Sequence, residues 1–201
     1  MLGFLTGWSL ILAIGPQNLF VIEQGLKRNF VFTITTICAA SDILLIFLGI
    51  FIYHIFDSIS LEVEVILNII LIVFLINYIK DKIGSLKKEY KIENIERSQN
   101  FKEIILKTLG FTYLNPHVYS DTVFILGNLS KNFALQEKFY FAFGASFASI
   151  IFFYSLGYMS SMFASFIKKK NTWKYINSFI ISFMSILVIY ITYDTYVRVF
   201  S

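Results

Sequence analysis

The amino-acid sequence predicts an all-α integral membrane protein with six transmembrane helices, arranged as two inverted three-helix repeats. Of its 201 residues, 57% are hydrophobic and only 15% are charged. A water-soluble domain of this size could not bury so many apolar side chains in its core. The apolar residues fall into six runs, most of which have the roughly 17 to 25 residues that a helix needs to cross the hydrocarbon. These runs cover residues 2–22, 30–53, 63–79, 104–126, 139–167 and 175–197.

The first and fourth helices are predicted to be interrupted at Gly15-Pro16 and Asn115-Pro116, because these positions hold the only two prolines. Proline inside a helix has no N–H to donate and its ring clashes with the carbonyl four residues back. Glycine and asparagine are also good N-caps, and proline suits the first position of a helix. One proline alone would more simply kink a packed helix, but two at matched depth favour new helix starts inside the membrane.

Three other features of the runs have structural interpretations and predict no further functional site. The first run has no basic residues before it and no small-residue cleavage site, so we interpret it as a mature helix and not a signal peptide. Cys38 is the only cysteine, which excludes an internal disulfide and a multi-cysteine metal site. Small residues in the second and fifth runs, such as Ser41, Gly144 and Ser149, are predicted to let helices approach closely.

The only polar segment of any length, residues 80–103, is predicted to be a cytoplasmic linker between a first repeat, 1–79, and a second, 104–201, which together form one transporter domain. When the sequences of the two halves are aligned with an offset of 100 residues, Gly15-Pro16-Gln17-Asn18 falls opposite Asn115-Pro116-His117-Val118. Because each half has three spans, the second copy enters from the opposite face. Inverted repeats with interrupted helices at matching positions are typical of transporters.

The basic residues lie mostly in alternate connections between the spans. Loops one, three and five carry fourteen of the seventeen Lys and Arg residues, and the other side carries only Lys131, Lys138 and Arg198. Basic residues near helix ends stay cytoplasmic, so these loops are predicted inside and both termini outside. The single soluble stretch is too short and too rich in Asp and Glu for nucleic-acid binding.

Polar residues at the two breaks, together with two buried acids, predict a binding site. Helix starts offer unpaired N–H groups to an anion, and amide and imidazole side chains are available from Gln17, Asn18, Asn115 and His117. Asp42 and Asp121 lie deep in apolar runs, where an ionised Asp costs about 2.5 to 3.5 kcal/mol. A pocket with both polarities is complementary to an amino acid, and we expect neither a metal nor a cofactor.

Each of these side chains also has a structural alternative. Any of the amides could instead hydrogen-bond between helices, and either Asp could be held by a neighbouring Ser or Thr or could cap a broken helix. A different class of function is an intramembrane enzyme with Asp42 and Asp121 as an acid pair. The sequence lacks the Gly-any-Gly-Asp context of the intramembrane aspartyl proteases, so we expect no enzyme activity.

Three blocks of sequence resemble the LysE-type lysine and arginine exporters, part of the LysE/RhtB superfamily of bacterial amino-acid exporters. They are GPQNLFVIEQGLKR (15–28), CAASDILLIFLGIF (38–51) and YLNPHVYSDT (113–122), and GASFASIIFF and INSFIISFM are similar to weaker patterns. The resemblance implies a homodimer in the bacterial inner membrane that exports L-arginine or L-lysine, with proton exchange. Ser120 replaces the usual leucine, which bears on the substrate, and a neutral amino acid or another small zwitterion is the alternative.

The resemblance also implies a set of substrate-binding residues, and independently of it Asp42 and Asp121 are the predicted proton-coupling groups. Moving a cation outward against an inside-negative potential costs about 2.3 kcal/mol per 100 mV, and exchange for an incoming proton removes that cost. The implied binding positions are Gly15, Pro16, Gln17, Asn18, Asp42, Asn115, Pro116, His117, Tyr119 and Asp121.

Overall fold

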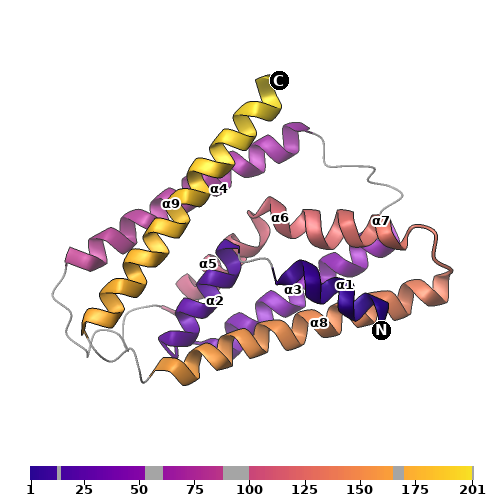
Figure 1. The fold of residues 1–201 in the computed structure, drawn as a ribbon, viewed down its shortest axis with the longest axis horizontal. Helices are drawn as coiled ribbons and strands as arrows, with labels where there is room; N and C mark the ends of the chain where they lie inside the picture. The colour runs from indigo at the N-terminus through magenta and orange to yellow at the C-terminus, as the bar shows by residue number, and fades with distance from the viewer. Residues whose placement is uncertain (13–14, 53–60, 88–99, 165–169, 201) are drawn as a thin grey trace.

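The computed structural model of the protein describes residues 1–12, 15–52, 61–87, 100–164 and 170–200, and this part of the chain is helical without a β-strand (Figure 1). The all-α prediction is therefore confirmed for these residues. The helices are α1 (Leu2–Ile11), α2 (Pro16–Leu26), α3 (Val31–Ile52), α4 (Leu61–Lys87), α5 (Phe101–Tyr113), α6 (Pro116–Tyr119), the π-helix η3 (Ser120–Ile125), α7 (Leu126–Ser130), α8 (Leu135–Met162) and α9 (Lys170–Phe200).

Three of the described helices are long and apolar enough to cross a membrane by themselves: they contain the stretches Val31–Phe51, Leu135–Met162 and Tyr175–Val197. The pair α1 and α2, bent by 81°, makes a fourth span if it is counted as one. The remaining two predicted runs form α4, whose apolar part is Asn68–Lys80, and the broken series α5 to α7. The protein is thus a multi-pass membrane protein, and six spans in two inverted repeats stay a prediction.

Both predicted interruptions are present. Helix α1 ends at Ile11 and α2 begins at Pro16, with Gly15 as an extended N-cap at φ −110° and ψ −179°. Helix α5 ends at Tyr113 and α6 begins at Pro116. Proline stands at the first position of each new helix, where its missing N–H has no consequence.

The predicted linker is partly helical. Residues 80–87 continue α4, and α5 begins at Phe101 with Asn100 as its N-cap. The Asn100 side chain accepts a hydrogen bond from the backbone N–H of Lys102, which satisfies one of the free donors at the start of that helix. Residues 88–99 lie outside the described part of the chain.

Close contacts between helices occur at small residues, as predicted for Gly144 of the fifth run, and also at glycines of the first run that were not predicted. A Cβ added to Gly7 of α1 would lie 2.9 Å from the Ala145 Cα of α8, and one added to Gly144 of α8 would lie 2.8 Å from the Phe4 backbone nitrogen. Gly3 and Gly7 have the four-residue spacing that brings membrane helices together. Helix α1 therefore lies against α8 with the two backbones almost in contact (Figure 1).

An aromatic cluster fixes α2, α4 and α5 relative to one another. The ring of Phe111 on α5 stacks on Phe20 of α2 at a centroid distance of 4.7 Å, and meets Tyr78 of α4 edge-on at 5.0 Å. Phe20, Tyr78 and Phe111 are all buried. Such aromatic pairs contribute more to stability than their buried area alone accounts for. This cluster therefore stabilises the position of α2, the helix that begins at the first break.

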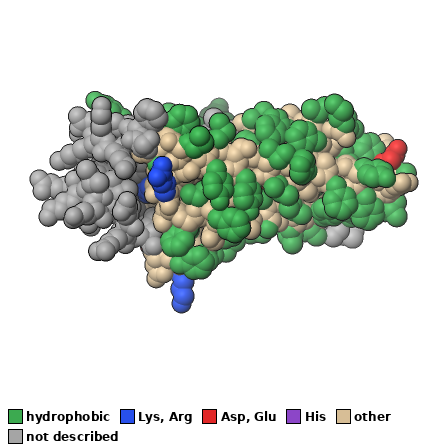
Figure 2. All heavy atoms as spheres, turned by 90° about the horizontal axis from the view of Figure 1, so that it is seen from below, with side chains coloured by type: hydrophobic (Ala, Val, Ile, Leu, Met, Phe, Trp, Pro, Cys, Tyr) green, Lys and Arg blue, Asp and Glu red, His purple; other side chains and the backbone are tan. Residues whose placement is uncertain are grey.

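The outer surface is largely apolar. Figure 2 shows hydrophobic side chains spread along one face of the molecule, and the Lys and Arg side chains visible among the described residues lie toward one end of it. Large side chains are exposed along α8 and α9, including Phe147 and Tyr190. Such a surface is suited to contact with lipid and not with water.

Candidate functional site

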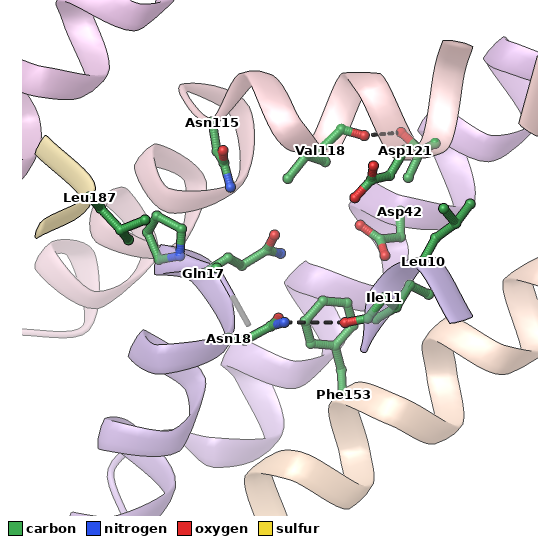
Figure 3. Close-up of a pocket in the computed structure, with 13 residues that line it drawn as sticks. Leu10, Ile11, Gln17, Asn18, Asp42, Asn115, Val118, Asp121, Phe153 and Leu187 are labelled. Atoms are coloured by element: carbon green, nitrogen blue, oxygen red, sulfur yellow. Dashed lines mark hydrogen bonds between the residues drawn. The ribbon is translucent and has the colours of Figure 1, made fainter. Parts of the chain in front are cut away.

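The two helix breaks, the buried Asp42 and the half-buried Asp121 line a single cavity of about 170 Å³ (Figure 3). This is well above the volume of about 10 to 15 Å³ that one water molecule needs, so a small solute fits. The walls are formed by Leu10, Ile11, Gly15, Pro16, Gln17, Asn18, Asp42, Asn115, Val118, Asp121, Thr122, Phe153 and Leu187.

The two breaks lie directly beside each other. A Cβ built on Gly15 would be 3.8 Å from Nδ2 of Asn115, although the two residues are 100 positions apart in the chain. Asn115 is 3% exposed and its amide is directed toward the cavity (Figure 3). The N-caps of α2 and α6 thus meet at one place in the molecule.

The residues that follow Pro16 place amide groups in the wall. Nε2 of Gln17 donates to Oγ1 of Thr112 at 3.1 Å, and that hydroxyl donates to the Thr108 carbonyl at 2.9 Å. This chain fixes the Gln17 side chain against α5. The Gln17 amide is thereby held at the cavity wall.

Asn18 closes the broken end of α1. Its Nδ2 donates to the Ile11 carbonyl at 3.3 Å (Figure 3), a carbonyl at the end of α1 that the interrupted helix leaves without its usual intrahelical partner. Tyr119 does the same at the second break, where its hydroxyl donates to the Tyr113 carbonyl at 2.9 Å. In both breaks, therefore, a side chain from the new helix satisfies a carbonyl of the preceding one.

The two carboxylates come from different helices and face the same space. Asp42 on α3 is 4% exposed and accepts a hydrogen bond from Oγ of Ser149 on α8 at 3.0 Å. Asp121 lies in the π-helix η3, and its carboxyl group is directed toward Asp42 (Figure 3). Both carboxyl groups therefore line one cavity, where like charges repel.

The arrangement separates two kinds of polar group. Amides from Gln17, Asn18 and Asn115 lie at the side of the helix breaks, and the acids Asp42 and Asp121 lie at the other side (Figure 3). None of the described residues that line the cavity is Lys, Arg or His. Because a buried charge is costly without a partner, the acids favour a cation or a proton in this space.

Most of the predicted site residues are brought together. Gly15, Pro16, Gln17, Asn18, Asp42, Asn115 and Asp121 all line the cavity. Tyr119 does not line it, and its hydroxyl donates to the Tyr113 carbonyl. The side chains of Pro116 and His117 lie outside the described part of the structure, so their predicted contacts stay predictions.

Several wall and support residues were not predicted as part of the site. Ser149 was interpreted as a packing residue, and the structure shows that it also holds Asp42. Thr112, which supports Gln17, and the wall residues Thr122 and Phe153 were not singled out. Polar residues at matching depth in different apolar runs are the signal that was available for Thr112 and Ser149.

Comparison with known proteins gives one family and a consistent set of relatives. The family model of the LysE type translocator matches residues 8–195. The chain is 34% identical over 184 residues to the arginine exporter protein ArgO of Klebsiella pneumoniae (strain 342), and 33% identical over 184 residues to the protein of that name from Salmonella typhimurium. Each alignment covers 87% of this chain and 84% of the relative. No solved structure matches the chain significantly.

Proposed function

This chain belongs to the LysE type translocator family, and from that membership we propose that it is a secondary transporter that exports arginine from the cytoplasm. The observation that carries the proposal is the cavity shared by the two helix breaks, Asp42 and Asp121. The relatives named as arginine exporters support arginine as the substrate, with lysine as a second basic amino acid of the same charge.

The proposed substrate matches the polarity of the cavity. Its carboxylate binds at the start of α2, where Gln17 and Asn18 present side-chain amides and the helix dipole is positive. Its guanidinium binds at Asp42 and Asp121, since a planar cation with several N–H donors satisfies two carboxylates together. Leu10, Phe153 and Leu187 pack around the aliphatic stem.

Proton exchange follows from the same two acids. An ionised carboxylate binds the guanidinium and a protonated one releases it, so a proton and the substrate compete for one group. Two carboxylates that line one cavity repel when both are ionised, and this repulsion is relieved by either ligand. An inward proton thereby replaces an outgoing arginine, which removes the electrical cost of moving the cation outward.

The proposed topology has six spans in two inverted repeats, with loops one, three and five in the cytoplasm and both termini outside. The uneven distribution of Lys and Arg among the loops supports it. Interrupted helices meeting at the membrane midplane are the arrangement that such repeats produce. In this topology α2 runs from the cavity to the cytoplasmic face.

The test is arginine export from living cells. Cells that express the chain and cells that lack it are fed an arginine-containing dipeptide, which is hydrolysed inside, and internal and external arginine are followed with time. We expect lower internal and higher external arginine when the protein is present. If a threonine-containing dipeptide gives the same or stronger export while arginine does not, the substrate is a neutral amino acid and this proposal is wrong.

A further inference from the structure

A second cavity, of about 360 Å³, lies between α2 and the first turns of α9. No polar atom is exposed on its wall, so it suits an apolar occupant and not water. Tyr175 and Phe179 at its edge are 75% and 61% exposed. Among the described residues this cavity is therefore a groove open to the protein surface, here called the α2–α9 groove. It is lined by Leu19, Ile22, Glu23, Leu26, Tyr175, Ile176, Phe179 and Ile180.

Glu23 contributes only apolar atoms to the wall of the groove. The side chain is 1% exposed, and both carboxylate oxygens have partners inside the protein. Oε1 pairs with Nζ of Lys27, and Oε2 accepts a hydrogen bond from the Tyr78 hydroxyl of α4. Because a buried carboxylate is retained only with such partners, the charge of Glu23 is compensated within the protein and the groove stays apolar.

The groove follows the part of α2 that crosses one leaflet of the bilayer. With 11 residues, α2 is about 16 Å long, which is about half of the roughly 30 Å thickness of the hydrocarbon core. The helix begins at the first break, Pro16, and the groove follows it from Leu19 to Leu26. In the proposed topology this is the cytoplasmic leaflet, so an acyl chain of that leaflet lies at the same depth as the groove.

Basic residues gather at the cytoplasmic end of the groove. Residues 168–174 read KKKNTWK and lead directly into Tyr175, so they bring four lysines and no acidic residue. On the α2 side, Arg28 is exposed, and its Nε donates to the Ser161 carbonyl at the end of α8 at 3.2 Å. Lys27 is already paired with Glu23. The four lysines and Arg28 therefore attract an anionic headgroup to this end, next to the Trp and Tyr typical of a membrane interface.

The charges favour a lipid over a second copy of the chain in the groove. Two copies joined through the groove by twofold symmetry would place the same surface against itself. Their two basic segments would then lie close together, and like charges repel. An anionic phospholipid brings the opposite charge and an alkyl chain in the order that the groove presents them.

We propose that the α2–α9 groove binds one anionic phospholipid, with an acyl chain between α2 and α9 and the phosphate at Arg28 and the lysines of residues 168–174. This site goes beyond the proposed transport activity and is the same whichever amino acid is exported. Because the lipid fills the space between two helices of the folded protein, its binding stabilises the folded state by mass action.

The test is thermal unfolding of the purified protein in detergent, titrated with dioleoylphosphatidylglycerol or with dioleoylphosphatidylcholine. The two lipids have the same acyl chains, and only the first has a net negative headgroup. The rise in Tm with lipid concentration gives an apparent Kd for each lipid. We expect the wild type to bind the anionic lipid about tenfold more tightly, since each basic residue near an anionic lipid contributes about fivefold.

Filling the groove tests the position of the acyl chain. Ile176→Trp places a larger side chain in the groove, and we expect the apparent Kd for both lipids to rise about tenfold, as for the loss of about two buried CH₂ groups. The matched control on the same helix is Ile186→Trp, at a position that is 65% exposed and outside the groove. This control is expected to leave both Kd values unchanged.

Removing charge tests the position of the headgroup. Lys170→Gln/Lys174→Gln is expected to leave binding of phosphatidylcholine unchanged and to remove most of the preference for phosphatidylglycerol. The control is Lys131→Gln/Lys138→Gln, which removes two lysines from the opposite side of the predicted topology and is expected to keep the preference. An equal loss of preference in both pairs would show a general effect of net charge and overturn the proposal.

Three further results would also overturn it. The first is an equal Kd for the two lipids in the wild type. The second is an equal rise in Tm with glycerol 1-phosphate, which has the charge and lacks the acyl chain. The third is a change of Ile176→Trp in its monomer–dimer ratio by light scattering with unchanged lipid binding, which would assign the groove to a second copy. If Ile176→Trp does not fold, the two lysine pairs still decide. None of these measurements involves transport, so their outcome is separate from that of the arginine export test.

Discussion

Oγ of Ser149 donates a hydrogen bond to Oδ2 of Asp42 across 3.0 Å, and this contact joins α8 to α3 beside the cavity. The two residues are 107 positions apart in the chain. Asp42 is the carboxylate that the sequence predicts to be buried and that is buried in the structure. The orientation of Asp42 toward the substrate thus depends on a hydroxyl from another helix.

Ser149→Ala is expected to lower kcat/KM for arginine by about tenfold, because a hydrogen bond to a charged group is lost and Asp42 is held less firmly. Initial rates of export from arginine-loaded cells measure this. Ser161→Ala is the matched control on the same helix, since the Ser161 hydroxyl donates only to the Tyr158 carbonyl, at 2.7 Å. Wild-type kinetics in Ser149→Ala would show that the contact is packing alone.

Asp42→Asn and Asp121→Asn are expected to remove the response of arginine export to an inward proton gradient. An amide neither takes up a proton nor pairs with a guanidinium, so exchange between the two stops. Arginine flux in vesicles, with the outside acidified or not, measures the effect. Asp194→Asn on α9, outside the cavity, serves as the control. A variant of either cavity acid that keeps both the rate and the pH response would exclude that acid as the coupling group.

Gly7→Ala and Gly144→Ala are each expected to destabilise the protein by about 1 to 3 kcal/mol, because the added methyl group enters the backbone contact between α1 and α8. Thermal unfolding in detergent measures the change as a lower Tm. Gly84→Ala is the control: nothing lies within 4 Å of its added Cβ, so helix propensity alone gives a gain of about 0.5 to 1 kcal/mol. Equal Tm values for all three variants would contradict the close contact.

Tyr119→Phe is expected to lower stability by about 1 kcal/mol and to leave KM for arginine unchanged, because the lost hydrogen bond is the one to the Tyr113 carbonyl. Unfolding and transport kinetics on the same preparation separate the two effects. Tyr193→Phe, an exposed position on α9, is expected to change neither. A raised KM at unchanged stability would instead place Tyr119 at the substrate, as the resemblance implied.

Local chemistry explains why the sequence predicted the two breaks correctly. Proline cannot donate the helix hydrogen bond, so Pro16 and Pro116 interrupt their helices whatever the packing of the surrounding residues. An Asp in an apolar run is similarly informative, since its burial needs a partner in any fold. These two local rules were sufficient to assign Asp42, Asp121 and the amides of Gln17 and Asn18 to one cavity.

The remaining features depend on contacts that no local pattern contains. Ser149 meets Asp42 only because α3 and α8 pack in one particular register. The burial of Glu23 depends on Tyr78, which comes from another span. The length of α4 also differs from the predicted third run, because this helix continues past its apolar part into residues 80–87.

The π-helix that carries Asp121 gives the site a mechanical property. Its i→i+5 hydrogen bonds hold one extra residue in the turn, and Gly49 of α3 leaves room for that wide turn, since a Cβ there would lie 2.6 Å from the Thr122 carbonyl oxygen. Conversion of Ser120–Ile125 to ordinary α-helix would displace the extra residue and rotate Asp121 by about 100° around the helix axis. A shift of one residue in hydrogen bonding would therefore turn the Asp121 carboxyl group away from Asp42.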